Sequence, residues 1–383
     1  MITAERIPMV DLKSQYKRLK PEIDEAIQQC LETADYINNA FVREFQRNLA
    51  AFLWANRVVA CASGTDALQI ALLGLGLKPG DEVIVPAFTH AATVEAIALL
   101  GLTPVWADVD AHTFLLTAET AGKVLTSRAK AIVPVHLFGQ CADMEPLLQL
   151  AASHGLAVIE DVAQALGSEY EFGSGAVESA GTMGTVGCTS FFPSSNLGCY
   201  GDGGALMTND IDLAERFQMI ANHGQRKRYI HEVVGMNSRL DPLQAAVLTV
   251  KLRHLNEFNR QRQTAAARYD YLLKDVPGLQ TPVSRESSAH VYNQYTLIVP
   301  AGVRDSLRAH LYLNGIPSAV YYPVPLHLQP AYYSDRFPQG SLPVSERLSQ
   351  QVLSLPIHTE MDAQQQKQIA TLVSDFMLAK KGF

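Results

Sequence analysis

The sequence predicts an α/β protein whose main sheet is mostly parallel and is covered by helices on both faces. Seven short runs of β-branched or apolar residues recur between about residues 58 and 209, and helical patterns that close on glycine separate several of them. This alternation is typical of parallel sheets, whose ligands bind at the carboxyl ends of the strands. The predicted strands are VVACAS (58–63), EVIVP (82–86), PVWADV (104–109), AIVPVH (131–136), AVIEDV (157–162), CTSFFP (188–193) and ALMTN (205–209).

The pattern of the chain changes after residue 240. Residues 241–275 read as one long amphipathic helix that could bridge to a second domain. The remainder mixes predicted strands, at 292–299 and 316–324, with predicted helices, at 305–315 and 364–381. We therefore expect a small C-terminal α+β domain.

The bulk composition is that of an ordinary globular protein. The 383 residues are 48% hydrophobic and 18% charged, which suffices for a large core and two domains, expected at 1–250 and 251–383. The net charge of −7 includes no long basic or acidic run, so a small-molecule partner is favoured over a nucleic acid. The N-terminus lacks the apolar stretch of a secretory signal, and no window predicts a membrane span, so we expect a cytoplasmic protein.

The cysteines are five in number and scattered, so we expect buried, reduced thiols. His136 and Cys141 lie five residues apart, but two candidate ligands without a third make a weak zinc site. We expect no metal. The segment 171–185 is rich in Gly, Ser, Thr and Ala, which favours a mobile loop.

One predicted strand runs directly into a helix at Ser63-Gly64-Thr65. A glycine at such a turn lets the backbone approach a ligand closely, and the first amides of the helix favour an anion. The motif therefore predicts a phosphate site. The alternative is that Ser63 or Thr65 only caps the helix.

A second motif, VIEDVAQALG, ends a buried strand at Glu160-Asp161, with Gln164 close behind. A carboxylate at the buried end of a central strand is costly unless it meets a positive group. Asp161 therefore requires a cationic partner, and a protonated pyridine nitrogen would serve. The alternatives are a helix cap or a local arginine pair.

A third motif, TSFFPSSNLGCYGDGGALMTND, places Ser190 at a strand end and Ser195 in the turn that follows. This segment resembles the cofactor-lysine segment of the DegT/DnrJ/EryC1/StrS family of sugar aminotransferases, in which position 195 is lysine. The resemblance covers essentially the whole chain. Other matching segments, in the family's order, are VDLKSQY, SGTDAL, PAFTHAAT, VPVHLFGQCADM, NHGQRKRY, GMNSRLDPLQAA, YYPVPLHLQPAY and SLPIH.

The resemblance implies the type I fold of aminotransferases that depend on pyridoxal 5'-phosphate (PLP), with a seven-stranded sheet. The cofactor would be PLP or pyridoxamine 5'-phosphate (PMP). The active site would be shared between the subunits of a homodimer. The implied cofactor contacts are Gly64, Thr65 and Ser190 at the phosphate, Asp161 at the ring nitrogen, Gln164 near the 3-oxygen, His90 in place of the usual stacking aromatic, and Asn237 at the phosphate of the neighbouring subunit.

The serine at position 195 bears directly on the chemistry. The family's lysine forms a Schiff base with the cofactor and moves a proton, and a serine hydroxyl does neither well. Because general acid–base catalysis contributes about 10²–10⁴-fold, we expect amino transfer by this chain to be severely impaired. Three explanations are open: an engineered Lys→Ser change, a natural member with changed chemistry such as a PMP-dependent sugar dehydratase, and a non-catalytic binding protein. The intact surroundings of Ser195 favour the first.

The resemblance implies a nucleotide-linked keto-sugar as amino acceptor and glutamate as the usual donor. The motifs look most like enzymes that aminate C3 of UDP-2-acetamido-3-oxo-glucuronate for lipopolysaccharide O-antigen sugars, and a 4-oxo-sugar is the alternative acceptor. Arg226, Lys227 and Arg228 would suit a pyrophosphate or a sugar carboxylate, unless they form a solvated loop. Tyr321 and His327 are expected either to line the sugar pocket or to have structural roles.

Overall fold

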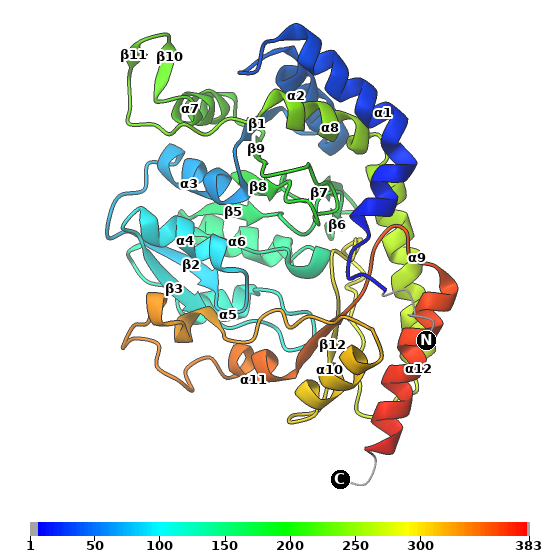
Figure 1. Cartoon of the computed structure of the whole chain (residues 1–383). Helices are drawn as coiled ribbons and strands as arrows, with labels where there is room; N and C mark the ends of the chain where they lie inside the picture. The colour runs from blue at the N-terminus through cyan, green and yellow to red at the C-terminus, as the bar shows by residue number, and fades with distance from the viewer. Residues whose placement is uncertain (1–6, 381–383) are drawn as a thin grey trace.

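The computed structural model describes residues 7–380, and a seven-stranded sheet forms its centre (Figure 1). The strand order is β1-β9-β8-β5-β4-β2-β3. Only β9 runs against the other strands of this sheet, so the predicted mostly parallel sheet is confirmed. Each predicted run overlaps one strand. The strands are β1 (Arg57–Cys61), β2 (Glu82–Pro86), β3 (Thr103–Ala107), β4 (Ala129–Ile132), β5 (Ala157–Asp161), β8 (Val186–Ser190) and β9 (Gly204–Thr208).

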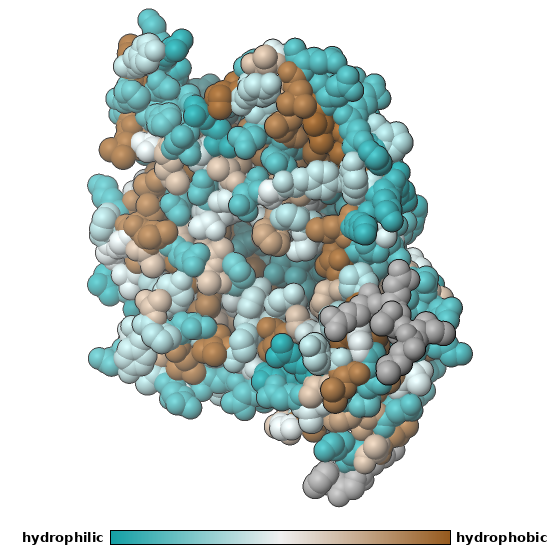
Figure 2. Space-filling view, in the orientation of Figure 1, coloured by the Kyte–Doolittle hydropathy of each residue, from teal (hydrophilic) through white to brown (hydrophobic). Residues whose placement is uncertain are grey.

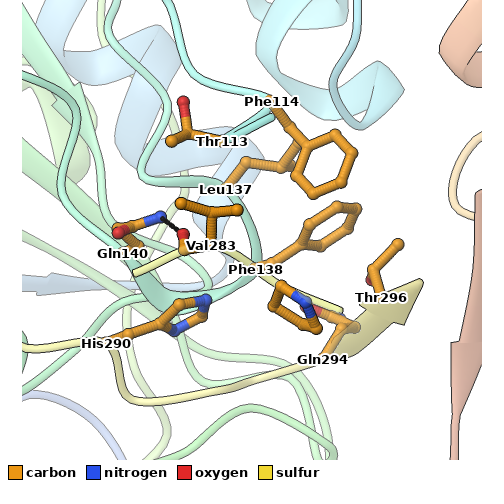
Figure 3. A pocket seen from close by; sticks show the side chains of 10 residues that line it. Thr113, Phe114, Leu137, Phe138, Gln140, Val283, His290, Gln294 and Thr296 are labelled. Atoms are coloured by element: carbon orange, nitrogen blue, oxygen red, sulfur yellow. Dashed lines mark hydrogen bonds between the residues drawn. The ribbon is translucent and has the colours of Figure 1, made fainter. Parts of the chain in front are cut away.

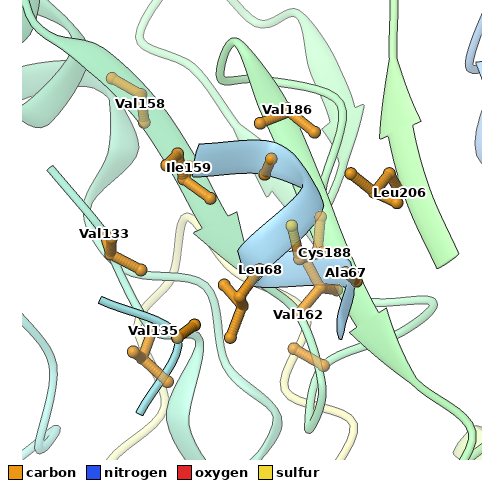
Figure 4. Packing of buried hydrophobic residues seen from close by; sticks show 14 of the residues in the cluster. Ala67, Leu68, Val133, Val135, Val158, Ile159, Val162, Val186, Cys188 and Leu206 are labelled. Atoms are coloured by element: carbon orange, nitrogen blue, oxygen red, sulfur yellow. The ribbon is translucent and has the colours of Figure 1, made fainter. Parts of the chain in front are cut away.

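The sheet is covered on both faces, because every residue of β2 and of β9 is buried. Helix α3 packs on β8 and β9, and Figure 4 shows its Ala67 and Leu68 among the apolar side chains of the sheet. The helices of this part of the chain are α1 (Leu12–Thr33), α2 (Ala40–Leu53), α3 (Gly64–Gly74), α4 (Ala91–Leu99), α5 (Ala118–Lys123), α6 (Met144–His154), α7 (Ile211–Ala221) and α8 (Pro242–Leu252).

The long helix predicted at 241–275 is broken. Helix α8 ends at Leu252, and α9 (Leu255–Leu273) begins after Arg253 and His254. The two helices pack in different places: α8 lies against α1 and α2, whereas the second half of α9 enters a separate core cluster. The apolar periodicity continues across the break, so the sequence pattern could not show it.

The second core cluster is built by α9 and the C-terminal elements. Strand β12 pairs antiparallel with β13, and both strands contribute residues to this cluster. Residues 326–348 instead pack on the cluster of the large sheet, so the boundary at residue 250 stays a prediction. The C-terminal elements are β12 (Tyr295–Ile298), α10 (Arg304–Leu313), the 3₁₀ turns η2 (Leu326–Leu328) and η3 (Pro330–Tyr332), α11 (Pro343–Gln351), β13 (Val352–Leu355) and α12 (Ala363–Ala379).

Two local predictions are wrong. Residues 316–324 form no strand: only Ala319 makes a bridge, to Ser354. The segment predicted as a loop contains most of a hairpin, β6 (Glu169–Glu171) and β7 (Val177–Ser179), and three amides in the turn beyond it bind the carboxylate of Glu160. In both places, tertiary contacts decide the conformation.

All five cysteines are free and buried, as expected. Within residues 7–380, the structure has no helix with both the length and the apolar character needed to cross a membrane. Figure 2 shows a surface of mixed hydropathy, with apolar residues gathered over the region of α1 and α2.

The start of β9 lies very close to the start of α3, and this contact yields a stability prediction. A Cβ atom at Gly204 would lie 2.3 Å from the carbonyl oxygen of Ser63, so Gly204→Ala must push the two segments apart. We expect a loss of about 1–3 kcal/mol in the free energy of unfolding, measured by chemical denaturation. Gly122→Ala is the matched control, because its Cβ meets nothing within 4 Å and its helix gains propensity. Equal stability of the two variants would contradict this account.

Candidate active site

Three segments meet at the predicted phosphate site: the start of α3, the end of β8 and the start of β9. We call Ser63–Thr65, Ser190 and Gly204 the phosphate seat. A Cβ atom at Gly64 would lie 2.6 Å from the Cβ of Ser190, so only glycine fits there. Ser63 does cap α3, since its hydroxyl accepts a hydrogen bond from the amide of Asp66 at 3.1 Å. The first amides of the helix still lie outside its own hydrogen-bond ladder, so capping and anion binding are compatible.

Asn237 lies beside the same seat. Its neighbour Ser238 is buried, donates to the carboxylate of Asp66 at 2.6 Å and accepts from the amide of Ala62 at 3.1 Å. The side chain of Asn237 is exposed. The chain segment is therefore fixed at the edge of the phosphate seat of its own subunit, while its contact with a neighbouring subunit stays a prediction.

Asp161 ends β5 and is only 7% exposed. One carboxylate oxygen accepts from the hydroxyl of Thr93 at 2.8 Å, and the other accepts from the amide of Ala163 at 3.1 Å. Burial raises the pKa of this carboxyl, although the two hydrogen bonds oppose the shift. No arginine or lysine among residues 7–380 forms a salt bridge with it. The arginine-pair alternative is thus excluded for the described residues, and the site suits a cation from a ligand, such as a protonated pyridine ring.

His90 caps α4 and also faces the site. Its Nδ1 atom accepts a hydrogen bond from the amide of Ala92 at 3.1 Å, which fixes the ring. The imidazole is exposed, and its centroid lies 5.9 Å from that of Tyr322. An exposed imidazole that is held in place by a hydrogen bond and lies beside another aromatic ring can cover one face of a flat ligand.

Gln164 is held at both ends of its amide. Its Oε1 accepts from the amide of Phe138 at 2.7 Å, and its Nε2 donates to the hydroxyl of Tyr322 at 3.1 Å. Tyr322 was missed by sequence reasoning, which considered its neighbour Tyr321. It belongs to the segment wrongly predicted as a strand. Just beyond that segment, the amide of Leu326 donates to the carbonyl of Ala87.

Ser195 lies in a tightly fixed turn after β8. Its amide donates to the carbonyl of Phe192 at 2.8 Å. The next residue, Asn196, is buried and is hydrogen bonded to Asn259, Val291 and Asn293. The turn is therefore fixed by hydrogen bonds of both Ser195 and Asn196.

Lys251 lies against this turn. Its Nζ donates to the carbonyl of Gly198 at 2.7 Å and lies 4.4 Å from the ring centroid of Tyr200. Burial lowers the pKa of this lysine to about 8. Because the amine is buried and bonded to the backbone, it supports the turn.

The predicted sugar-binding residues are scattered. Arg228 is exposed at the tip of the hairpin β10 (Gln225–Lys227) and β11 (Ile230–His231), where it stacks over Tyr229. His327 is fully buried and bonds to Glu346 at 3.2 Å, and burial lowers its pKa. Tyr321 is half-buried and contacts Tyr322. Direct contact of these three residues with a sugar stays a prediction.

A small cavity lies between the turn at 137–140 and strand β12 (Figure 3). Its volume of about 10 Å³ holds at most a water molecule, so it is no sugar pocket.

The described residues contain no group of three side chains that could hold a metal ion. His136 bonds instead to Glu160, and Cys141 to Ser168.

The fold is that of the sugar aminotransferases. The chain belongs to the DegT/DnrJ/EryC1/StrS aminotransferase family, whose sequence profile matches residues 17–374. The UDP-2-acetamido-2-deoxy-3-oxo-D-glucuronate aminotransferase of Pseudomonas aeruginosa is 46% identical over 356 residues, which are 93% of this chain and 96% of that protein. A pleiotropic regulatory protein of Geobacillus stearothermophilus is 42% identical over 372 residues, 97% of this chain and 98% of the relative.

Solved structures agree with this assignment. DesV from S. venezuelae, solved with a ketimine intermediate, superposes with a TM-score of 0.94 at 42% identity and covers 98% of this chain and 99% of its own. NtdA from Bacillus subtilis, solved with bound PMP, has a TM-score of 0.90 at 28% identity, over 99% of this chain and 87% of its own.

The raised pKa of Asp161 yields a prediction for the cofactor-free protein. Its folded pKa is raised above the usual 3.8, so stability falls as the pH rises from 3.8 through the raised value. Asp161→Asn removes this cost, and the hydroxyl of Thr93 can reverse to accept from the new amide. We expect the variant to melt at a higher temperature than the parent at neutral pH, with the difference shrinking in acid.

Asp110→Asn is the matched control. Burial would raise the pKa of Asp110, but hydrogen bonds from Thr113 and His112 outweigh it and lower the pKa. This carboxylate stabilises the fold above its unfolded pKa, so its loss should lower the melting temperature at neutral pH. Equal destabilisation by the two substitutions would contradict the conclusion that the Asp161 carboxylate destabilises the cofactor-free protein.

Proposed function

We propose that this chain holds PLP or PMP in the site around Asp161, and that it derives from an enzyme that transfers an amino group, from glutamate, to a keto-sugar nucleotide. The observation that carries the proposal is the buried, unpaired carboxylate of Asp161 next to a glycine-lined phosphate seat. An ionic partner on a flat phosphorylated ligand satisfies both features at once.

Each side chain has a role in this proposal. The amides of Gly64 and Thr65 and the hydroxyl of Ser190 hold the phosphate. Asp161 keeps the ring nitrogen protonated, and Gln164 orients the ring at its 3-oxygen. His90 covers one ring face, and its hydrogen bond to the start of α4 holds the imidazole for this role. The cofactor supplies an electron sink for the substrate carbon when it is bound.

Ser195 removes the amine that the reaction requires. Its hydroxyl lacks a basic partner among its neighbours in sequence, so it is a poor proton acceptor at neutral pH. We infer an engineered Lys→Ser change, because the turn, the phosphate seat and Asp161 are all retained. The second candidate is a non-catalytic binding protein, because one relative is named as a regulatory protein. A PMP-dependent dehydratase is the third.

For the acceptor we propose UDP-2-acetamido-3-oxo-glucuronate, and so a place in lipopolysaccharide O-antigen sugar synthesis. The support is the relative with 46% identity that is named for this substrate. The basic residues Arg226, Lys227 and Arg228 would meet the pyrophosphate or the uronate carboxylate. A 4-oxo-sugar nucleotide is the alternative acceptor.

We also propose a homodimer with shared active sites. The hairpin β10–β11 projects from the body of the subunit (Figure 1). Tyr229 on this hairpin is 77% exposed and Val234, just beyond it, is 93% exposed, which favours burial against another surface. A second copy would bring Arg228 and Asn237 toward a neighbouring site.

Restoring the amine tests the proposed function directly. Ser195→Lys should bind PLP covalently and give a visible absorption band that glutamate removes, because the retained turn presents the new amine to the cofactor. Ser194→Lys is the control, since it adds the same amine one residue away and should give neither band nor turnover. Absence of both effects in Ser195→Lys would contradict the aminotransferase reading.

The same assay separates the alternatives. A binding protein would take up cofactor or nucleotide sugar tightly but show no turnover after restoration. A dehydratase would release water from a 4-keto-sugar nucleotide as the unmodified chain with PMP. To identify the acceptor, the rate of amino transfer by Ser195→Lys is compared between the 3-oxo-uronate nucleotide and a 4-oxo-sugar nucleotide.

Mixed dimers test the shared site. The parent chain lacks the lysine, and a chain carrying S195K and N237A lacks the amide that should reach the other subunit. Each should be inactive or weak alone, whereas a mixture should form sites that combine the lysine of one chain with Asn237 of the other. We expect glutamate-dependent amino transfer to rise on mixing. Full activity of the double variant alone would show that Asn237 is dispensable.

A further inference from the structure

Glu160 is the neighbour of Asp161 on β5 and points to the opposite face of the sheet, because successive strand residues alternate. It is fully buried. Its carboxylate accepts hydrogen bonds from the amides of Gly181, Met183 and Gly184, at 2.8, 2.9 and 2.6 Å. The fourth donor is the Nε2 atom of His136, at 2.9 Å.

The ring of His136 is neutral in this arrangement. Its Nδ1 accepts from the amide of Ala142 at 3.1 Å, so the proton must reside on Nε2, which donates to Glu160. His136 is fully buried as well. The Glu160 carboxylate therefore has four hydrogen-bond donors, and no arginine or lysine among residues 7–380 forms a salt bridge with it.

His136 also holds the backbone of Asp161. Its amide donates to the carbonyl of Asp161 at 3.0 Å, and the amide of Asp161 donates to Pro134 at 2.9 Å. One residue thus bonds through its backbone to Asp161 and through its side chain to Glu160. The end of β5 is fixed from two sides at the point where the Asp161 carboxylate leaves the sheet.

We propose that His136 and Glu160 are positioning residues for the cofactor: they hold the Asp161 carboxylate at the place of the ring nitrogen. The inference rests on the proposed function, since it requires that contact. A merely structural pair would affect every ligand of the site alike, whereas a positioning pair affects the ring-nitrogen contact selectively.

The test compares two ligands on the chain as it stands, because Ser195 allows non-covalent binding to be measured at equilibrium. One ligand is PMP, and the other is its 1-deaza analogue, in which C–H replaces the ring nitrogen. Calorimetric titration gives the ratio of the two Kd values. We expect Glu160→Gln to reduce the preference for PMP about 10-fold while leaving the Kd of the analogue nearly unchanged.

Three further variants guard against misfolding of Glu160→Gln. His136→Leu should reduce the preference in the same way, and His136→Gln, which keeps a donor, should restore part of it. Thr185→Val is the matched control: it removes the hydrogen bond from the amide of Val158, at the far end of β5, and should lower the melting temperature without changing the ratio.

Equal weakening of both ligands by the His136 variants, or an unchanged ratio in them, would overturn the proposal. The proposed function itself would be contradicted if the parent chain bound PMP and the analogue equally, or bound neither of them. The two failures are therefore distinguishable.

Discussion

The buried carboxylate of Asp161 is the constraint on which the site depends. It ends a central strand without a cationic partner from the described part of the chain, and burial raises its pKa. The fold accepts this cost because Thr93 and Ala163 supply hydrogen bonds and the end of β5 is fixed by neighbouring backbone. Under the proposed function, a ligand with a positive ring nitrogen would recover this cost as binding energy, so the same residue would destabilise the empty protein and select the cofactor.

Much of the fold could be predicted from sequence. The seven runs overlap the strands because buried parallel strands are continuous apolar segments that helices separate. The errors arose where tertiary contacts override local pattern. Helices α8 and α9 share one apolar periodicity but pack in different places. The stretch at 316–324 is rich in β-branched and aromatic residues, yet it crosses toward the site without pairing along its length.

The site was predictable only where a motif carries the chemistry. Ser190 and Asp161 end strands β8 and β5, Gly64 begins α3 shortly after β1, and the structure brings them to one edge of the sheet. Tyr322 contacts Gln164 across a separation of 158 residues, which no local pattern reports. His136 was considered as a metal ligand with Cys141, because spacing alone cannot show that its ring bonds to Glu160. The roles assigned to Arg228, Tyr321 and His327 depend on a sugar and stay predictions.

The central proposal is that the site around Asp161 selects a protonated ring nitrogen, although a serine stands at position 195. Nitrogen-15 NMR of ring-labelled PMP bound to the chain tests it most directly. The account predicts the chemical shift of a protonated pyridine nitrogen, maintained to a pH at which the free cofactor has lost that proton. A neutral-pyridine shift in the bound cofactor, or no binding at all, would contradict it.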